Sequence, residues 1–411
     1  MDNRDVSCLR PQGDLGAGGG PAQAMSGGPG ALPIACRNKG RFGQEFCLAQ
    51  CEAATGGGLF EYARVEQPAD VPAPAAHVID VAVLDMNHGW PNLGHDSLVH
   101  AVQDAVCDLG PRLRRAGLRV RTISYDVRRR HMIPEGPGGR FALYLGTGGP
   151  GHIDPHCNDG VSLGTQGIVE DPAWEPRVFE LFERVLADEH AALFAVCHTF
   201  GVMCRWSGVA RPVLRGAAKG GKSAGILDNV LTPEARRHPW FARLADELPD
   251  GHRLPVVDHR LYDLIPQERP LPAGVLAIGY ETRGVGGPAG DALTMLEFAR
   301  DSKGAMPRVF AVNHHPEIVD RERQMLILRR KREKGEVGED WFEERRAVLE
   351  ATHDDPGRDR RLHLTSDYAL LGPLRFQLYR QLRRRAEALR VPLRLHEDEV
   401  LDQRLSATER S

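Results

Sequence analysis

The chain has 411 residues, a formal net charge of −3 and eight cysteines. The near balance of charge excludes the global attraction that nucleic-acid-binding proteins use. The sequence has no uninterrupted apolar run near the roughly 20 residues that a membrane-spanning helix needs, and the first residues lack the apolar core of a secretory signal. The irregularly spaced cysteines predict reduced thiols in a cytoplasmic protein. From the charge balance and the lack of a long apolar run, we expect neither nucleic-acid nor membrane partners.

Residues 1–76 differ in composition from the rest of the chain. Their Gly- and Pro-rich sequence cannot bury an apolar core, so we expect a disordered N-terminal arm. Cys36, Cys47 and Cys51 lie within it, but they lack both the C-x-x-C spacing and the fourth ligand of a usual zinc site. We therefore expect no metal centre in this arm.

From residue 77 onward, short apolar runs alternate with segments whose apolar residues recur at helical spacing. This alternation predicts a parallel sheet with helical crossovers, and the unbroken apolar character of the strands predicts that both faces are covered. The expected fold class is therefore α/β, a three-layer sandwich with a mostly parallel central sheet over residues 77–319. The expected strands are 77–87, 118–127, 141–151 and 191–198, and the expected helices are 96–117 and 175–190.

The second half of the chain is more mixed. Residues 211–216 and 223–231 suggest the strands of a hairpin. From residue 320 to 411 the sequence is charged and has helical periodicity, which predicts a helical C-terminal extension. Further strand candidates lie at 252–265, 273–281 and 307–318.

The strand around 191–198 contains Cys197 close to its end. A thiol at a strand-to-helix turn is pushed out of the sheet and meets the N-terminus of the next helix. That position lowers a thiol pKa and directs backbone N–H groups toward a developing oxyanion. Cys197 is therefore a candidate nucleophile rather than a small core residue.

Two other segments suit the same chemistry. His315 and Glu317 are two residues apart on an extended segment, so they can share a face, one as a base and the other as its orienting carboxylate. A second strand ends in Gly148 and Gly149, which allow the backbone to approach a substrate closely.

In the order and rough spacing of "GTGGPG", "AVCHTFG" and "HPE", the chain resembles the class I glutamine amidotransferase family from about Val78 to Val319. The resemblance implies a flavodoxin-like sandwich and attack on glutamine or a γ-glutamyl-type amide through a thioester, without metal or organic cofactor. Ammonia would pass to a separate synthetase subunit, or it would be released while water acts as the only acceptor in a simple hydrolysis. The implied catalytic residues are Cys197, His315 and Glu317, and the implied oxyanion or substrate-binding residues are Gly148, Gly149, His198, Thr199, Gly201 and His259.

Three positions around the nucleophile depart from the family pattern Gly-x-Cys-x-Gly-x-Gln, because this chain has Ala195, Thr199 and Gly201 there. Loss of the glutamine at 201 removes a group that contacts substrate in the family, so the resemblance predicts thiol chemistry more firmly than it predicts the substrate. Two alternatives stay open: a homoserine-type O-acyltransferase on a similar fold, and a catalytically silent scaffold that binds a partner through its helical tail.

Two further motifs do not fit their usual structural context. Residues 216–223 match the P-loop pattern, but a strand rather than a long helix is expected to follow them. Residues 152–159 contain metal-capable side chains, which we interpret as a polar rim of the site.

Overall fold

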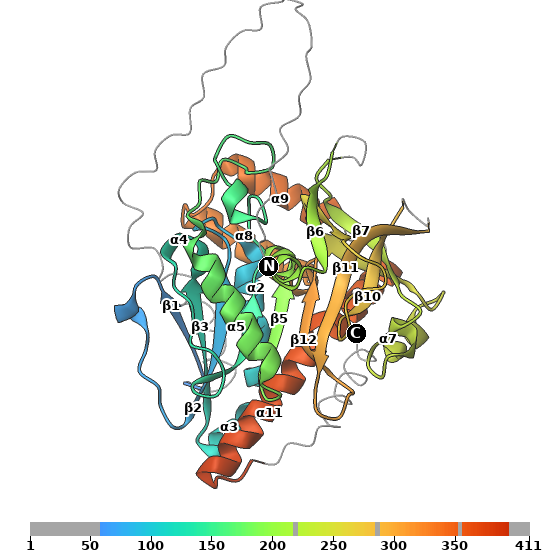
Figure 1. Cartoon of the computed structure of the whole chain (residues 1–411). Helices are drawn as coiled ribbons and strands as arrows, with labels where there is room; N and C mark the ends of the chain where they lie inside the picture. The colour runs from blue at the N-terminus through green and yellow to red at the C-terminus, as the bar shows by residue number, and fades with distance from the viewer. Residues whose placement is uncertain (1–57, 217–220, 284–287, 352–355, 394–411) are drawn as a thin grey trace, which may run out of the picture.

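The computed structural model describes residues 58–216, 221–283, 288–351 and 356–393, and Figure 1 shows their arrangement. The strands form a mixed sheet with helices on both faces, which is the expected three-layer α/β architecture. Within the described ranges, no helix combines the length and hydropathy that crossing a bilayer requires.

The parallel half of the sheet runs in the order β1-β3-β2-β4-β5-β12. Successive side chains point to opposite faces, so Val81 and Val83 join one apolar core while Ala82 and Leu84 join the other. These strands are β1 (Phe60–Val65), β2 (Val78–Asp85), β3 (Arg119–Asp126), β4 (Phe141–Gly146), β5 (Ala192–Val196) and β12 (Pro307–Val312).

Strand β1 corrects the N-terminal boundary expected at residue 76. It pairs in parallel with β3 and forms an edge of the sheet. Polar side chains of β1 find partners on neighbouring strands: Arg64 Nη1 donates to Asp85 Oδ2 at 2.7 Å, and Glu61 Oε1 accepts from Arg119 Nη1 at 2.7 Å. The rest of the expected arm, including Cys36, Cys47 and Cys51, lies outside the described residues.

The antiparallel half extends from β12 through β11, β10, β7 and β8. The expected hairpin between 211–216 and 223–231 is wrong, because β6 pairs with β9 whereas β7 pairs with β8 and β10. These strands are β6 (Ala210–Leu214), β7 (Gly225–Leu231), β8 (Arg253–Asp258), β9 (Tyr262–Pro266), β10 (Leu276–Thr282) and β11 (Ala289–Arg300).

Helices cover the two faces of the sheet. Buried residues of α2 (Leu93–Asp108), α3 (Gly110–Ala116) and α7 (Phe241–Glu247) belong to one core, and those of α5 (Glu175–Ala187) and α6 (His198–Ser207) belong to the other. The remaining short turns are α4 (Val127–Arg130), η2 (Pro68–Asp70), η3 (Pro155–Cys157), η4 (Pro172–Trp174), η6 (Ala235–Arg237), η7 (Pro316–Ile318) and η8 (Asp367–Leu371).

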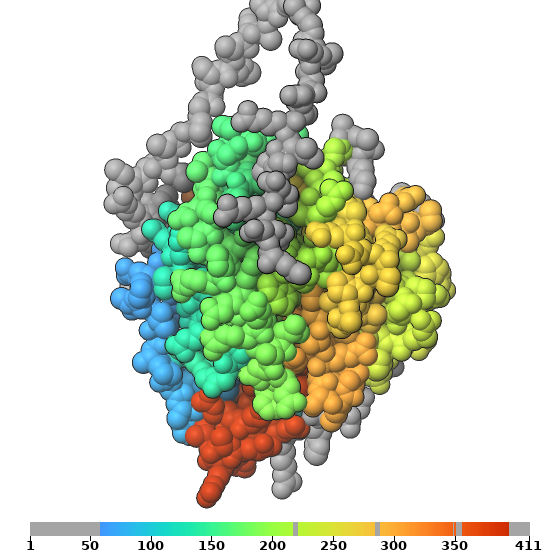
Figure 2. All heavy atoms as spheres, in the orientation of Figure 1, coloured from blue at the N-terminus to red at the C-terminus, as the bar shows by residue number. Residues whose placement is uncertain are grey.

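The C-terminal region is helical as expected, but it is not an appendage. Helix α11 (Gly372–Leu389) fills one face of the sheet with fully buried Leu374, Leu378 and Leu382. Figure 2 shows its red end directly below the green segment that contains α5, where Gln381 Nε2 donates to His190 O at 2.8 Å.

Helices α8 (Arg321–Glu333), α9 (Glu339–Ala351) and α10 (Pro356–Ser366) precede α11. Met325 and Leu328 of α8 cluster with Phe342 and Leu349 of α9. Leu93 at the start of α2 packs against the same cluster, so α9 is anchored beside the end of the sheet where the candidate site lies.

Candidate active site

Cys197 occupies a strained turn between β5 and α6. Its φ of 50° and ψ of −100° lie in a region that L-residues other than glycine rarely adopt, at a cost on the order of 1–3 kcal/mol. The turn is held from two sides: Cys197 N donates to Val312 O at 2.7 Å, and Thr199 Oγ1 donates to Thr147 O at 2.7 Å. Neighbouring strand ends therefore fix the geometry that presents the thiol at the carboxyl edge of the sheet.

His315 and Glu317 lie just beyond the end of β12, the strand next to β5. The His315 backbone N–H donates to Val257 O at 2.8 Å, and its ring Nδ1 bonds Glu317 Oε1 at 2.8 Å. Both side chains are buried. The structure thus brings the three predicted residues to one edge of the sheet, although they are distant along the chain.

The charges around His315 favour its protonated form. Burial opposes that form, but the Glu317 carboxylate and then the Cys197 sulfur outweigh it, so the pKa of His315 is raised well above its usual value. The arrangement can therefore hold an imidazolium beside the Cys197 sulfur at neutral pH.

Glu317 is also confined from the side of α2. A Cβ at Gly94 would lie 2.5 Å from Glu317 Oε1, so the start of α2 approaches the carboxylate as closely as glycine permits. Gly94 was not singled out from the sequence, since nothing local distinguishes it from other helical glycines.

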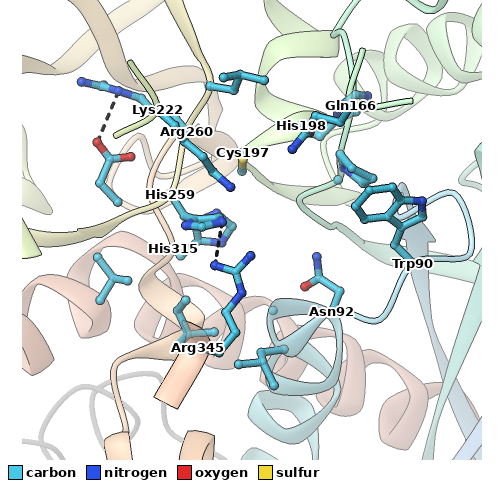
Figure 3. A pocket seen from close by; sticks show the side chains of 18 of the residues that line it. Trp90, Asn92, Gln166, Cys197, His198, Lys222, His259, Arg260, His315 and Arg345 are labelled. Atoms are coloured by element: carbon cyan, nitrogen blue, oxygen red, sulfur yellow. Dashed lines mark hydrogen bonds and ion pairs between the residues drawn. The ribbon is translucent and has the colours of Figure 1, made fainter. Parts of the chain in front are cut away.

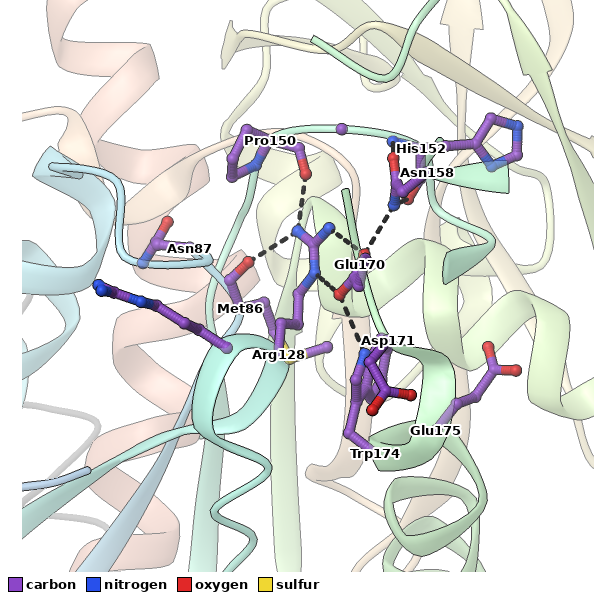
Figure 4. Close-up of polar contacts among 12 residues, drawn as sticks. Met86, Asn87, Arg128, Pro150, His152, Asn158, Glu170, Asp171, Trp174 and Glu175 are labelled. Carbon is purple, nitrogen blue, oxygen red and sulfur yellow. Dashed lines mark hydrogen bonds and ion pairs between the residues drawn. The ribbon is translucent and has the colours of Figure 1, made fainter. Parts of the chain in front are cut away.

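The glycine turn after β4 is held by a buried ion pair. Arg128 Nη1 donates to Met86 O at 2.9 Å and to Pro150 O at 2.6 Å, while Nε and Nη2 bind the two oxygens of Glu170 at 2.6 Å each (Figure 4). Both side chains are fully buried. A Cβ at Gly149 would collide with Met86 O, which explains the need for glycine there. Arg128 therefore fixes the loop that contains the Gly149 peptide.

These elements surround a cavity of about 350 Å³ (Figure 3). Of the residues predicted from the sequence, those in its lining are Gly149, Cys197, His198, His259 and His315. Glu317 lies behind His315, and Gly148 lies beside its ring, because a Cβ at Gly148 would be 3.0 Å from His315 Cε1.

Thr199 and Gly201 lie outside the cavity lining, which differs from the expected contact with substrate. Thr199 is fully buried against Gly146, where a Cβ would collide with its side chain. Gly201 faces Ile153, which occupies the space that a side chain at 201 would need. An amide side chain reaches the cavity from Gln166 instead.

His198 is buried and its pKa is lowered well below the usual value, first by burial and then by the charge of Arg128. Its backbone N–H is at the first position of α6, where no intrahelical acceptor exists. His198 and Gly149 both line the cavity. The expected oxyanion site requires this placement, since it uses the backbone N–H groups of these two residues.

The sequence missed several residues that line the cavity. Lys222 lies in the P-loop-like motif, which is followed by strand β7 and not by a helix, as predicted. Trp341 and Arg345 come from α9, in the expected helical C-terminal extension. Only the three-dimensional packing of α9 could have revealed them.

Besides Cys197, the described ranges contain further cysteines and metal-capable side chains. Cys204 is fully buried in α6, and burial raises its thiol pKa, as in a core residue. In the part of the chain that the structure describes, no three His, Cys, Asp or Glu side chains are grouped to hold a metal ion.

The search against family models found no match, and the search of curated proteins found none either. Among solved structures, a glutamine amidotransferase from Thermotoga maritima is similar at 17% identity and a TM-score of 0.39, over 74% of this chain and 98% of that chain. A putative GMP synthase component from Thermoplasma acidophilum is similar at 12% identity and a TM-score of 0.33, over 59% and 86%. The glutaminase domain of Trypanosoma brucei CTPS with bound acivicin is similar at 11% identity and a TM-score of 0.35, over 58% and 86%.

Proposed function

We propose that this protein is a cysteine-dependent amidotransferase or amidohydrolase that acts on glutamine or a γ-glutamyl-type amide. One observation carries the proposal: the strained Cys197 turn opens into the same cavity as His315, whose ring is held by Glu317 at 2.8 Å. A buried thiol without a catalytic role needs neither the strain nor a buried imidazole–carboxylate pair beside it.

In the first half of the reaction, the Cys197 sulfur attacks the amide carbonyl and forms a C–S bond. The carbonyl oxygen becomes an oxyanion, which the N–H groups of Gly149 and His198 stabilise. When the C–N bond breaks, protonated His315 gives its proton to the leaving nitrogen, and ammonia departs from a thioester. Glu317 orients the imidazole and stabilises its charge.

In the second half, neutral His315 takes a proton from water as the water oxygen attacks the thioester carbonyl. The C–S bond breaks, the acid is released, and the thiolate and imidazolium are restored. The ammonia is either released to solvent or accepted by a separate synthetase subunit in the cytoplasm. Both half-reactions use only groups of this chain and water.

Ammonia release from L-glutamine and from γ-glutamyl amides tests the proposal directly. We expect turnover in the wild type and its loss in Cys197→Ser and His315→Gln, with alkylation of Cys197 by 6-diazo-5-oxo-norleucine detected by mass spectrometry. Transfer of an acyl group to a homoserine-like hydroxyl without ammonia release would favour the acyltransferase alternative. Absence of any Cys197-dependent turnover or alkylation would favour the silent scaffold.

A further inference from the structure

Three cationic side chains line the cavity and have no part in the mechanism above. Arg260 is paired with Glu281 Oε2 at 2.6 Å, which leaves Lys222 and Arg345. Lys222 precedes β7, and Arg345 projects from α9; both line the cavity that contains Cys197. Figure 3 shows them on opposite sides of His259. They come from separate elements, so the coincidence of two cations in one small cavity is a property of the folded chain.

The imidazole between them is neutral and adds no compensating charge. Arg345 Nη1 approaches His259 Nε2 at 3.0 Å, and because a guanidinium only donates, the imidazole nitrogen must accept. Burial, followed by the charges of Arg345 and Lys222, lowers the pKa of His259 to about 2. This bond fixes the direction of the Arg345 guanidinium, and no other hydrogen bond to it is found in the part of the chain that the structure describes.

The acidic side chains around the cavity leave both cations largely unneutralised. Asp258 Oδ2 accepts from Ser223 Oγ at 2.7 Å and faces Arg260 Nε at 3.3 Å, whereas its buried Oδ1 has no hydrogen-bond partner in the described part of the chain. Glu344 is 3.9 Å from Arg345, but its side chain is 63% exposed, and such pairs contribute little. Within the described ranges, Lys222 forms no ion pair.

Resting on the proposed function, we propose that Lys222 and Arg345 bind a carboxylate on the acyl half of the substrate. The planar guanidinium suits a carboxylate, and lysine supplies a second charge. A free α-ammonium would face the same two cations, and Asp258, the buried carboxylate among the described lining residues, is already engaged through Oδ2 by Ser223 and Arg260. The preferred substrate is therefore an amide of net negative charge, such as the monoamide of a dicarboxylic acid or an N-acylated glutamine, rather than zwitterionic glutamine.

Protection of Cys197 from iodoacetamide measures binding independently of turnover. Glutarate carries the carboxylates, and glutaramide is its uncharged diamide of similar size. Mass spectrometry of the peptide that contains Cys197 reports the alkylation rate in the full-length protein at increasing concentrations of each compound. We expect glutarate to protect at concentrations at least about tenfold lower than glutaramide, in line with charge-assisted hydrogen bonds.

Arg345→Gln and Lys222→Gln should each raise the protecting concentration of glutarate about tenfold or more and leave that of glutaramide unchanged. Because the two residues lie on different elements, displacement of α9 cannot explain both effects. Arg346→Gln is the matched control, since Arg346 is the next residue of α9 and pairs instead with Glu343 and Glu350. It should leave glutarate protection at the wild-type value.

Turnover then separates this inference from the proposed function. We expect kcat/KM for glutarate monoamide to exceed that for L-glutamine about tenfold or more, and Arg345→Gln to remove the preference mainly through KM. Equal protection by glutarate and glutaramide, or glutarate protection that is unchanged in both variants, would overturn the anion site even if glutamine is hydrolysed. Charge-dependent protection without hydrolysis of any amide would retain the anion site and overturn the amidase.

Discussion

Gly94 offers a test of whether the carboxylate of Glu317 controls the reaction. Replacing Gly94 with alanine places a Cβ 2.5 Å from Glu317 Oε1, whereas ordinary contact begins near 3.4 Å. The carboxylate must therefore withdraw by about 1 Å, which lengthens its 2.8 Å bond to His315 Nδ1 beyond a good hydrogen bond.

The expected loss is kinetic rather than structural. A misplacement of about 1 Å in a catalytic group lowers the rate on the order of 10²-fold. Alanine is favoured over glycine within a helix by about 0.5–1 kcal/mol, which offsets part of the strain. We therefore expect kcat for ammonia release to fall about 10- to 100-fold, while the free energy of unfolding changes by no more than about 1 kcal/mol.

The assay combines steady-state ammonia release with urea denaturation of the same preparations. Gly338→Ala is the control, because a Cβ at Gly338 meets no atom within 4 Å, and it should retain wild-type kcat. Glu317→Gln should lower kcat by a comparable factor and add little to Gly94→Ala in the double variant. Wild-type kcat in Gly94→Ala, or full additivity in the double variant, would refute the idea that Gly94 acts through Glu317.

Three further outcomes follow from the site. Glu170→Gln leaves the fully buried Arg128 charge without its partner and should cost about 3–5 kcal/mol, a drop in melting temperature on the order of 10 °C, whereas exposed Glu350→Gln should leave melting unchanged. Cys197→Gly should be more stable than Cys197→Ala in urea, because glycine tolerates the φ of 50° whereas alanine keeps the strain; the usual order, with alanine more stable by about 0.5–1 kcal/mol, would contradict a strained turn. Glu317→Gln removes the carboxylate that raises the pKa of His315, so the imidazolium is lost at lower pH, and the descending limb of the pH profile of ammonia release should move to lower pH; an unchanged limb would assign it to another group.

The sequence was sufficient for features that rest on local signals. Apolar runs with covered faces predicted the strands of the parallel half, and Cys197 at a strand end predicted a strand-to-helix turn. The separation of two residues placed His315 and Glu317 within bonding distance. In each case the physical cause lies within a few residues of the chain.

Features that depend on distant neighbours were not predictable in this way. The family resemblance predicts that Thr199 and Gly201 contact substrate, yet their surroundings are set by Gly146 and Ile153, each about 50 residues earlier. Thr199 fits where a glycine is usual because Gly146 yields the space. A side chain at Gly201 would collide with Ile153. The residues found at positions 199 and 201 therefore fit the packing of the neighbouring elements.

Strand β1 was not predictable from the sequence for a related reason. Its sequence, FEYARV, is half polar and follows a Gly-rich stretch, so its composition resembles that of the expected arm. Among the described strands, β1 pairs only with β3. Arg119 of β3 bonds Glu61, and Asp85 of β2 bonds Arg64. The polar residues that obscured the strand are the ones that hold it in register.

The start of α2 connects the C-terminal region to the chemistry. Leu93 packs into the cluster that anchors α9, and the next residue, Gly94, contacts Glu317. The helix that carries Arg345 and the carboxylate that orients His315 are therefore supported by two consecutive residues. Because Leu93 and Gly94 belong to the first turn of α2, we expect a displacement of α9 that moves Leu93 to alter the position of Gly94 beside Glu317. In the proposed mechanism, substrate recognition by Arg345 and proton transfer by His315 therefore share one support, and α9 forms part of the cavity wall.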